Sequence, residues 1–415
     1  MGVVSCGTTV IDNGVVNVGA VNWDTTTKTA SFTAVSGNGY FVNTTSTAIT
    51  VTLPAGSAGD IVGISDYAST FQTNNVTITP NGADKINGVN QNATLDTQGI
   101  AVTLVYVDST RGWKSVTGSD DNTSGVTPFI NATGGTITES GDYRIHTFTG
   151  PGTFSVSSVA PGPSGNPNTV DYLVVAGGGG GGGGIGGGAG AGGYRESSGN
   201  TGCYTSSPLA TPTGITITAT DFPITVGAGG TGRCAPSGPC AARGANSIFS
   251  TITSAGGGVD TPGLTPGGSG GGEGHRGGAG GTGNTPPVSP PQGQNGGSAP
   301  GPAGYAGAGG GGAIAAGTTT AGGGGSSAGP GGNGTTSSIN GTPTARAGGG
   351  GGGFYITPGG GTGGTGGGGN GGGTTGQNGQ NGTVNTGGGG GGGGFPDGNG
   401  GTGGSGIVII RYKFQ

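Results

Sequence analysis

Apolar residues recur along this chain in short runs, and their spacing is typical of strands. Ile49, Val51 and Leu53 alternate with two threonines, which predicts a strand with one buried face. Nowhere do apolar residues recur at i, i+3, i+4 and i+7 over several turns, as they do in an amphipathic helix. The pattern therefore predicts an all-β protein with essentially no α-helix.

The first 118 residues contain several such runs. Asn13-Gly14 lies between two apolar runs, a pattern that favours a β-hairpin. Residues 1–28 are predicted to form an N-terminal attachment arm, and residues 29–118 a β domain with further strands at 49–53, 61–64, 76–78, 101–107 and 113–116. These strands are rich in threonine, so the core they predict is thin. Burial of one face against copies of the chain would stabilise it, which favours a homo-oligomer, most simply a trimer around a fibre axis.

A second group of strands is predicted at 130–137, 143–148 and 153–159, within a connecting β segment that spans residues 119–169. Gly150-Pro151-Gly152 forms a turn signal between the last two. The segment leads into the apolar run 170–176, and a matching apolar run occupies 407–412.

Glycine dominates the sequence between those two runs. The chain has 115 glycines, and most of them follow residue 170 in blocks such as 177–184, 348–353 and 387–394. By composition alone this is a flexible linker, because ordering its backbone costs on the order of 100 kcal/mol with no side-chain burial in return. A disordered tether, however, needs no strand at each end and usually carries more charge.

Residues 170–415 are therefore predicted to form an ordered bundle of polyglycine-II helices, closed by the terminal strands. This helix has three residues per turn and no internal hydrogen bonds, so its N–H and C=O groups point outward and bond to neighbouring glycine helices. Other glycine-rich structures fit less well. The sequence lacks the strict period of collagen, the regular aspartates of calcium-binding repeats and the G-K-[S/T] of a phosphate-binding loop.

Charge excludes several classes of partner. The net charge is −5 and only 7% of residues are charged, so no basic surface for nucleic acid is expected. No apolar run reaches the roughly 20 residues of a membrane helix, and the N-terminus does not resemble a secretory signal. The four cysteines fit no zinc pattern. Cys234 and Cys240 could clip a loop as a disulfide, although reduced thiols are favoured.

Neither catalysis nor a bound metal or cofactor is expected. His146 alternates within a strand pattern and His275 lies in a small polar loop without a nucleophile beside it. The closest carboxylate pairs, Asp60 with Asp66 and Asp120 with Asp121, lie in turn-like contexts that do not indicate glycan hydrolysis.

Binding is the better-supported activity. Polyglycine helices present no side chains, so recognition must come from the turns between them, where aromatic residues gather. The candidate receptor-contact residues are Tyr194, Arg195, Tyr204, Tyr305, Phe354, Tyr355 and Phe395. Aromatic faces suit sugars or loops of outer-membrane proteins. The alternative is that these side chains cap and seal the bundle.

Several motifs together resemble the fibre proteins of marine tailed phages, particularly those that infect cyanobacteria. The motifs lie at residues 39–46 (GYFVNTTS), 49–54, 104–113 (LVYVDSTRGW), 170–184, 191–196 (AGGYRE), 224–230 (ITVGAGG), 284–292 (NTPPVSPPQ) and 404–412 (GSGIVIIRY). The glycine-rich part is also similar to phage fibre-tip adhesins, whose receptor-binding domains are layered polyglycine-II helices with variable loops. Residues 1–28 match no motif of these proteins.

The resemblance implies a virion fibre or adhesin. Its N-terminal region would attach to other tail or capsid proteins, and its glycine-rich loops would contact a host-surface glycan or outer-membrane protein. Two alternatives remain open: a purely structural fibre or decoration protein of the tail or capsid, and an ice- or surface-binding bundle. The latter needs a regular threonine array, and the threonines here are irregular.

Overall fold

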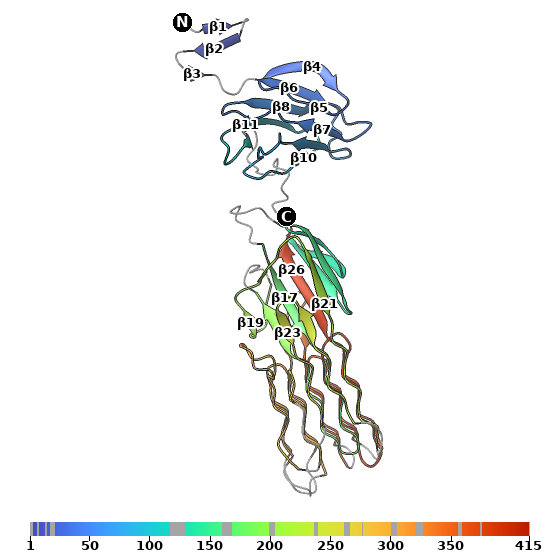
Figure 1. Ribbon diagram of the computed structural model, residues 1–415. Coiled ribbons are helices and arrows are strands. Elements are labelled where there is room, and N and C mark those ends of the chain that lie inside the picture. Colours follow the sequence, from blue (N-terminus) through green and yellow to red (C-terminus); the bar gives the residue numbers. More distant parts are fainter. Residues whose placement is uncertain are drawn as a thin grey trace. The chain divides into compact units, whose positions relative to one another are not determined.

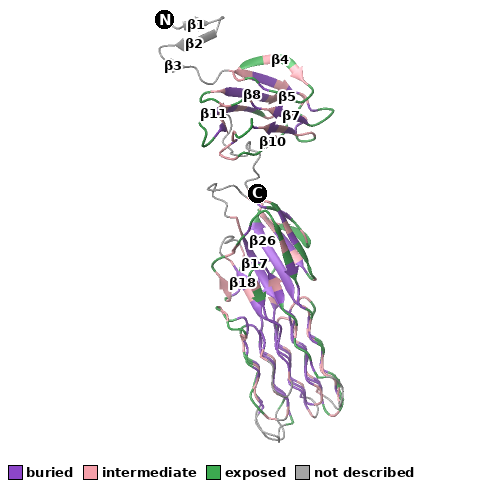
Figure 2. Ribbon diagram, viewed as in Figure 1, coloured by how far each residue is buried: buried purple, intermediate pink, exposed green. Residues whose placement is uncertain are grey.

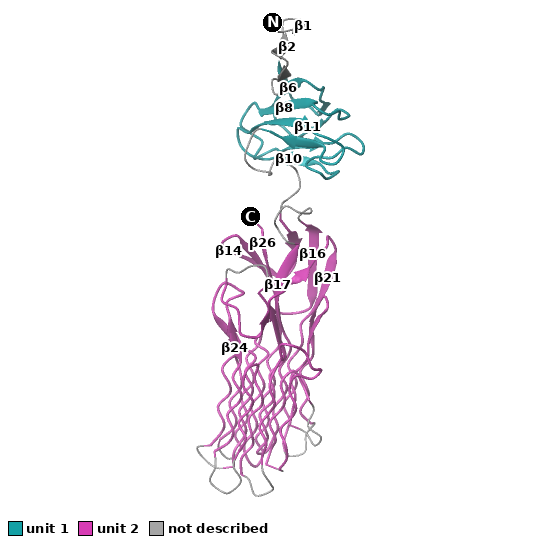
Figure 3. Cartoon of the chain, turned by 90° about the vertical axis from the view of Figure 1, so that its left-hand side faces the viewer, with its two compact units in different colours: residues 1–128, 160–166 teal, residues 129–159, 167–415 magenta. Residues whose placement is uncertain are grey.

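The structure is a computed structural model that divides into two compact units, residues 1–128 with 160–166 and residues 129–159 with 167–415 (Figure 3). It describes the backbone of three short strands before residue 17, and residues 21–116, 129–159, 168–198, 204–235, 240–260, 266–275, 277–299, 305–320, 327–355, 359–373 and 376–414. No helix occurs among the described residues, in agreement with the predicted all-β class.

Near the N-terminus, β1 (Val3–Ser5), β2 (Thr8–Asp12) and β3 (Val15–Val16) form a small antiparallel sheet. Asp12 pairs with Val15, so the strands flanking Asn13-Gly14 are antiparallel, as the hairpin signal predicts. The following strand, β4 (Asn22–Lys28), does not belong to an arm. It pairs with β6 (Asn38–Val42), and the Trp23 ring lies so close to Gly39 that a Cβ there would be 2.7 Å from it.

The first unit is built from two facing sheets whose central strands run parallel (Figure 1). In one sheet β4, β6 and β8 (Ile61–Asp66) pair in parallel. In the other, β5 (Phe32–Thr33), β7 (Ile49–Thr52) and β9 (Val76–Thr79) pair in parallel. The antiparallel strands β10 (Ala93–Leu95), β11 (Ala101–Tyr106) and β12 (Trp113–Ser115) complete the two sheets.

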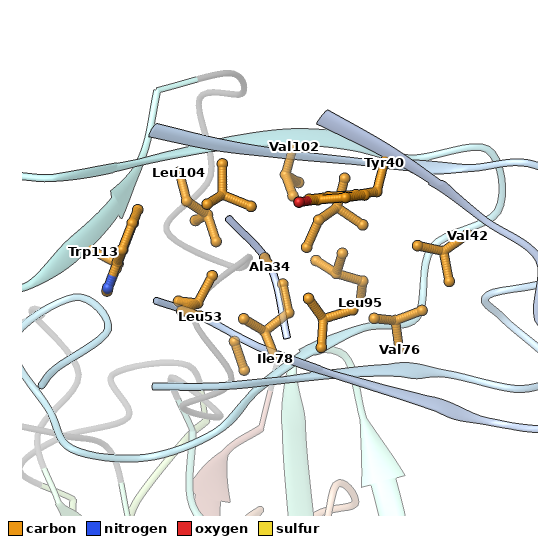
Figure 4. Close-up of a cluster of buried hydrophobic side chains, with 14 of the residues drawn as sticks. Ala34, Tyr40, Val42, Leu53, Val76, Ile78, Leu95, Val102, Leu104 and Trp113 are labelled. Carbon is orange, nitrogen blue, oxygen red and sulfur yellow. The ribbon is translucent and has the colours of Figure 1, made fainter. Parts of the chain in front are cut away.

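A continuous apolar core fills the space between these two sheets (Figure 4). Val51 and Leu53 belong to it, as the alternating pattern predicts, and Trp113 is fully buried at one side. Because two sheets of one chain enclose this core, its burial requires no second chain. The homo-oligomer therefore stays a prediction.

The second unit begins with a sandwich of two sheets. Its strands are β13 (Asn131–Thr133), β14 (Thr136–Ser140), β15 (Tyr143–Phe148), β16 (Gly152–Ser158), β17 (Thr169–Val175), β18 (Tyr194–Ser197), β19 (Ala210–Thr211), β20 (Ile215–Thr216), β21 (Asp221–Thr225), β22 (Ser247–Phe249), β23 (Ile252–Ser254) and β26 (Ile407–Lys413). One sheet has the order β13-β16-β21-β22-β23 and the other the order β14-β15-β26-β17-β18-β19, with β20 pairing separately with β17. A two-stranded sheet, β24 (Thr335–Ser337) with β25 (Thr344–Arg346), lies in the same unit.

The two apolar runs that flank the glycine stretch pair with each other. β17 and β26 are antiparallel neighbours at the centre of the larger sheet, which confirms that the stretch is closed by terminal strands. The predicted strand 130–137 is divided in two at Gly134 and Gly135, which both have positive φ. A Cβ on Gly134 would lie 2.0 Å from the Thr153 carbonyl oxygen, so the chain can bend there only with glycine.

The glycine blocks form extended rods that run away from the sandwich side by side (Figure 1). In rod 177–182 the N–H groups bond to three neighbouring rods in rotation, so that every third residue returns to the same one. Gly177 and Gly180 donate to Ala245 and Ala242, Gly178 and Gly181 to Gly404 and Gly401, and Gly179 and Gly182 to Gly190 and Gly187. A repeat of three residues per turn, with all bonds between rods, is the pattern of polyglycine-II helices.

Carbonyl groups of the same rod bond to three further rods. They accept from Gly230 and Arg233, from Gly257, and from Gly390 and Gly393. Rod 177–182 is therefore surrounded by hydrogen-bonded neighbours, and the interior of the bundle is buried along its length (Figure 2). A Cβ on Gly180 would lie 1.9 Å from the Thr231 carbonyl oxygen, so close packing excludes any side chain there.

Amide side chains complete the hydrogen-bond network at the surface of the bundle. In residues 377–382, Gly379 and Gly382 are buried, whereas the Gln and Asn residues between them are exposed. Asn378 and Asn381 accept hydrogen bonds from the N–H groups of Asn399 and Thr402, at 2.8 and 2.9 Å. An outer rod lacks backbone partners on its solvent side, so these side chains supply the missing acceptors for the next rod.

Candidate binding site

The rods are connected at both ends of the bundle, and one set of these turns, which we name the loop end, lies opposite the sandwich (Figure 3). Rod 177–183 starts directly after β17 and therefore reaches this loop end at the turn 183–186. The turn is central, because Gly186 donates to Gly393 and accepts from Gly353, and Ile185 is buried. Side chains on the loops around it are the ones that the bundle presents farthest from its strands.

Three predicted contact residues come together here in what we name the aromatic cluster: Tyr305, Tyr355 and Phe395. The ring of Tyr355 lies between the other two, with its centroid 4.8 Å from that of Tyr305 and 4.5 Å from that of Phe395. Tyr305 is 46% exposed and Phe395 is 39% exposed. The cluster thus forms a tilted stack of rings with its outer members open to solvent.

Backbone bonds between three separate loops hold this cluster. The N–H of Tyr355 donates to the carbonyl of Tyr305 at 3.1 Å, and that of Phe395 donates to Phe354 at 3.2 Å. Phe354 itself is 8% exposed and packs with two alanines of neighbouring rods. It therefore seals the bundle beneath the cluster, as the capping alternative predicts, and does not face a partner.

A small hollow lies on another side of the central turn. Arg233, Asp260 and His275 line it with the backbone of the turn 183–186 and Gly274, and the space inside it is about 10 Å³, roughly enough for one water molecule. We name it the polar hollow. The Asp260 carboxylate accepts the N–H of Gly187 at 2.8 Å, and the N–H of His275 donates to Ile185 at 3.3 Å. All three side chains are partly exposed.

Sequence reasoning did not identify this hollow as a site. Arg233, Asp260 and His275 are far apart in the sequence, and each lies at the end of a different rod. A usable signal exists, because a charged residue at the end of a glycine block must lie at one end of the bundle. Which such residues are neighbours, however, depends on the order of the rods.

The remaining candidates lie at the sandwich end of the bundle. Tyr194 is 2% exposed on β18, and its hydroxyl donates to Glu196 at 2.8 Å. Glu196 also accepts from the N–H of Ser207 and the hydroxyl of Ser337, at 3.0 and 2.5 Å. Burial raises the pKa of the Tyr194 phenol well above its usual value. Tyr194 therefore stabilises the fold and is not accessible to a receptor.

Tyr204 and Arg195 belong to the same region. The Tyr204 hydroxyl donates to the Ser197 carbonyl at 2.5 Å, and burial raises the pKa of this phenol as well. Arg195 is half-buried on β18, opposite Val174. Neither lies at the loop end.

The groups weighed for catalysis have structural partners. His146 is fully buried, with Nδ1 at 2.7 Å from the Gly134 carbonyl and Nε2 at 3.0 Å from the Tyr412 hydroxyl. Asp60 accepts from the Ser57 N–H and the Ser36 hydroxyl, and Asp66 accepts from loop N–H groups. Asp120 and Asp121 lie outside the described residues.

Cysteines and metals add little to the site. Cys234 and Cys240 are free and exposed near the loop end, and Cys6 and Cys203 lie outside the described residues. Within the described part of the chain, no group of His, Cys, Asp and Glu residues could hold a metal ion. The same residues form no apolar helix that could cross a bilayer.

Comparison with known families identifies the second unit. A glycine-rich domain family matches residues 149–413, which is more than half of the chain. The protein therefore belongs to this glycine-rich domain family. No curated protein matches the sequence.

Proposed function

We propose that this protein is a non-enzymatic virion fibre protein that contacts the host surface through the loop end of its glycine bundle. The observation that carries the proposal is the aromatic cluster. Tyr305, Tyr355 and Phe395 come from three loops, yet they form one exposed stack at the end of a rigid bundle. Aromatic rings that remain accessible and are held by ordered backbone are typical of recognition surfaces.

The assignment to a phage particle is supported by the resemblance of the motifs in both units to marine tailed-phage fibre proteins. In that setting the first unit belongs to the shaft, and the N-terminal strands attach the fibre to the tail or capsid. The trimer and the location on the virion are part of this proposal.

The test uses point variants, because truncation is unsuitable. Removal of residues 177–415 would also remove β26 and so open the sandwich. The full-length chain, fluorescently labelled, is incubated with a panel of cyanobacterial strains. The double variant Tyr305→Ala, Phe395→Ala should bind at least ten times more weakly than the wild type to those strains that the wild type binds.

A matched control comes from the other end of the same rods. Ile314 is 46% exposed and Val384 is 67% exposed, and both lie near the sandwich. The double variant Ile314→Ala, Val384→Ala should bind cells like the wild type. Equal binding by the Tyr305 and Phe395 variant, or no binding of the wild type to any strain, would instead favour a purely structural fibre.

A further inference from the structure

We propose that Asn81 is a site of spontaneous chemical modification, and that the asparagines of the glycine bundle are locked against the same reaction. The reaction is deamidation, in which the backbone nitrogen of the following residue attacks the asparagine side chain. A following glycine permits it best, because glycine has no Cβ to obstruct the attack. The chain has many Asn-Gly steps, and their surroundings differ between the two units. This inference does not depend on the proposed function.

Deamidation replaces the side-chain amide with a carboxylate. The glycine nitrogen loses its proton and forms a bond to the side-chain carbonyl carbon, and the amide nitrogen takes up a proton and leaves as ammonia. Water then opens the resulting five-membered succinimide ring at either of its two carbonyl carbons. The products are aspartate and isoaspartate, each with one added negative charge. A hydrogen-bonded N–H cannot react until its bond opens, as in amide hydrogen exchange.

Six Asn-Gly steps lie in the bundle, and each is held at both of its reacting groups. The glycine N–H donates to a carbonyl of a neighbouring rod at 2.8 or 2.9 Å. The asparagine side-chain oxygen accepts an N–H from the same neighbouring rod, at 2.8–3.1 Å. The six steps begin at Asn295, Asn333, Asn370, Asn378, Asn381 and Asn399.

The step at Asn381 shows how the two bonds act together. Its side-chain oxygen accepts the Thr402 N–H at 2.9 Å, and the Gly382 N–H donates to the Thr402 carbonyl at 2.8 Å. A Cβ on Gly382 would lie 2.2 Å from the Gly388 carbonyl oxygen, so the backbone there has little room to bend. Succinimide formation would turn the side chain away from Thr402 and take the glycine nitrogen out of its bond. Both contacts with the neighbouring rod must therefore break together.

Asn81, in the first unit, has neither restraint. Asn81 and Gly82 are exposed, and Gly82 has a φ of 54°. The Asp84 N–H donates to the Asn81 carbonyl at 2.8 Å, so the turn forms without the Gly82 N–H. Within the described part of the chain, neither that N–H nor the Asn81 side chain has a hydrogen-bond partner. A Cβ on Gly82 would meet no atom within 4 Å, which leaves space for ring closure.

The other described Asn-Gly steps are held by their surroundings. The Gly88 N–H donates to Arg111 at 2.7 Å, and the Gly341 N–H donates to Ser338 at 2.8 Å. Asn38-Gly39 lies within β6, between the partner strands β4 and β8. Asn13-Gly14 lies outside the described residues. Among the described steps, Asn81-Gly82 should therefore react first.

The experiment incubates the full-length protein in a mildly alkaline buffer, digests it briefly at acidic pH and measures deamidation of each asparagine by mass spectrometry. Asn81 should react at least ten-fold faster than each of the six bundle asparagines and yield both aspartate and isoaspartate. The Asn81→Gln variant should lack this fast reaction. Asn87→Gln, at the held step before Gly88, is the matched control and should leave it unchanged.

The same protein in guanidinium chloride shows the reactivity of the unfolded chain, in which the bundle asparagines should react at rates similar to that of Asn81. If they also react as fast as Asn81 in the native protein, the rods do not lock them. If Asn81 stays intact in the native protein while it reacts in the denatured chain, the turn protects it and the assignment is wrong. Aspartate without isoaspartate would exclude the succinimide route.

Discussion

Leu173 and Ile409 lie opposite each other in the paired strands β17 and β26, although the whole glycine-rich stretch separates them in the sequence. Both are fully buried. The sandwich can therefore close only when the rods have brought the chain back to its starting point. The bundle is an insertion within a sheet, and its order is coupled to the order of that sheet.

We expect deletion of residues 407–415 to unfold the second unit and leave the first intact. The deletion removes β26, whose neighbours on both sides then lose their partner strand. Calorimetry should show the loss of one unfolding transition. Trp113 is buried in the core of the first unit, so its fluorescence should be unchanged. Persistence of both transitions would contradict the coupling.

Glycine in the bundle interior should be irreplaceable. Gly180→Ala places a methyl group 1.9 Å from the Thr231 carbonyl oxygen. The backbone there cannot move without breaking its hydrogen bonds to neighbouring rods. We expect a loss of about 3 kcal/mol in the free energy of unfolding, the upper range for overpacking. Faster hydrogen exchange in peptides of the neighbouring rods would report this loss of stability.

Gly150 provides the control for this substitution, since a Cβ there meets no atom within 4 Å. Gly150→Ala should therefore change stability by less than about 0.5 kcal/mol. If the wild-type glycine rods exchange their amide protons as fast as an unfolded chain, the ordered bundle itself is wrong and the stretch is a tether.

The sequence was sufficient to predict an ordered polyglycine-II bundle because the signals are local. The strand patterns at 170–176 and 407–412 and the low charge are visible without a structure. The order of the rods cannot be predicted from the sequence, because glycine blocks are chemically interchangeable and each can bond to any other. This is why Tyr305, Tyr355 and Phe395 could be named as candidates but not recognised as neighbours.

Tyr194 shows a different limit of prediction from the sequence. It follows glycine residues, as Phe354 and Phe395 do, but it begins β18 at the sandwich end. Tyr194 and Glu196 are buried while Arg195 is partly exposed. The sequence does not show this burial, because Glu196 is charged and the four residues of β18 have no alternation of apolar and polar side chains. In the first unit β7, β8, β9, β11 and β12 were predicted, whereas β4, β5, β6 and β10 were not, and the parallel pairing of its strands depends on long-range contacts.

Surface amides should stabilise the outer rods. Asn378→Ala together with Asn381→Ala removes the acceptors for the N–H groups of Asn399 and Thr402. Water can replace part of these bonds because the residues are exposed, so we expect a combined loss of about 1–2 kcal/mol in the free energy of unfolding. Asn378→Asp with Asn381→Asp retains the acceptor oxygens. That pair should preserve most of the stability, and an equal loss in both pairs would contradict this role.

The stability of the second unit should depend on pH through His146. The Gly134 carbonyl can only accept, so Nδ1 donates to it, and Nε2 of the neutral ring accepts from Tyr412. Burial, reinforced by the charge of Arg144, lowers the pKa of His146 below its usual 6.5. The folded state therefore favours the neutral ring, whereas the unfolded chain takes up a proton near pH 6.5.

This contribution to stability should be fully present above about pH 7.5 and decrease as the pH falls through 6.5 towards the lowered pKa of the folded state. The His146→Gln variant lacks the titrating group. It should be less stable than the wild type at pH 7.5, since glutamine cannot reproduce the ring contacts with Phe154 and Tyr412. The difference in melting temperature between the two proteins should then narrow between pH 7.5 and 5.5. A difference that stays constant over this range would show that His146 is protonated equally in both states.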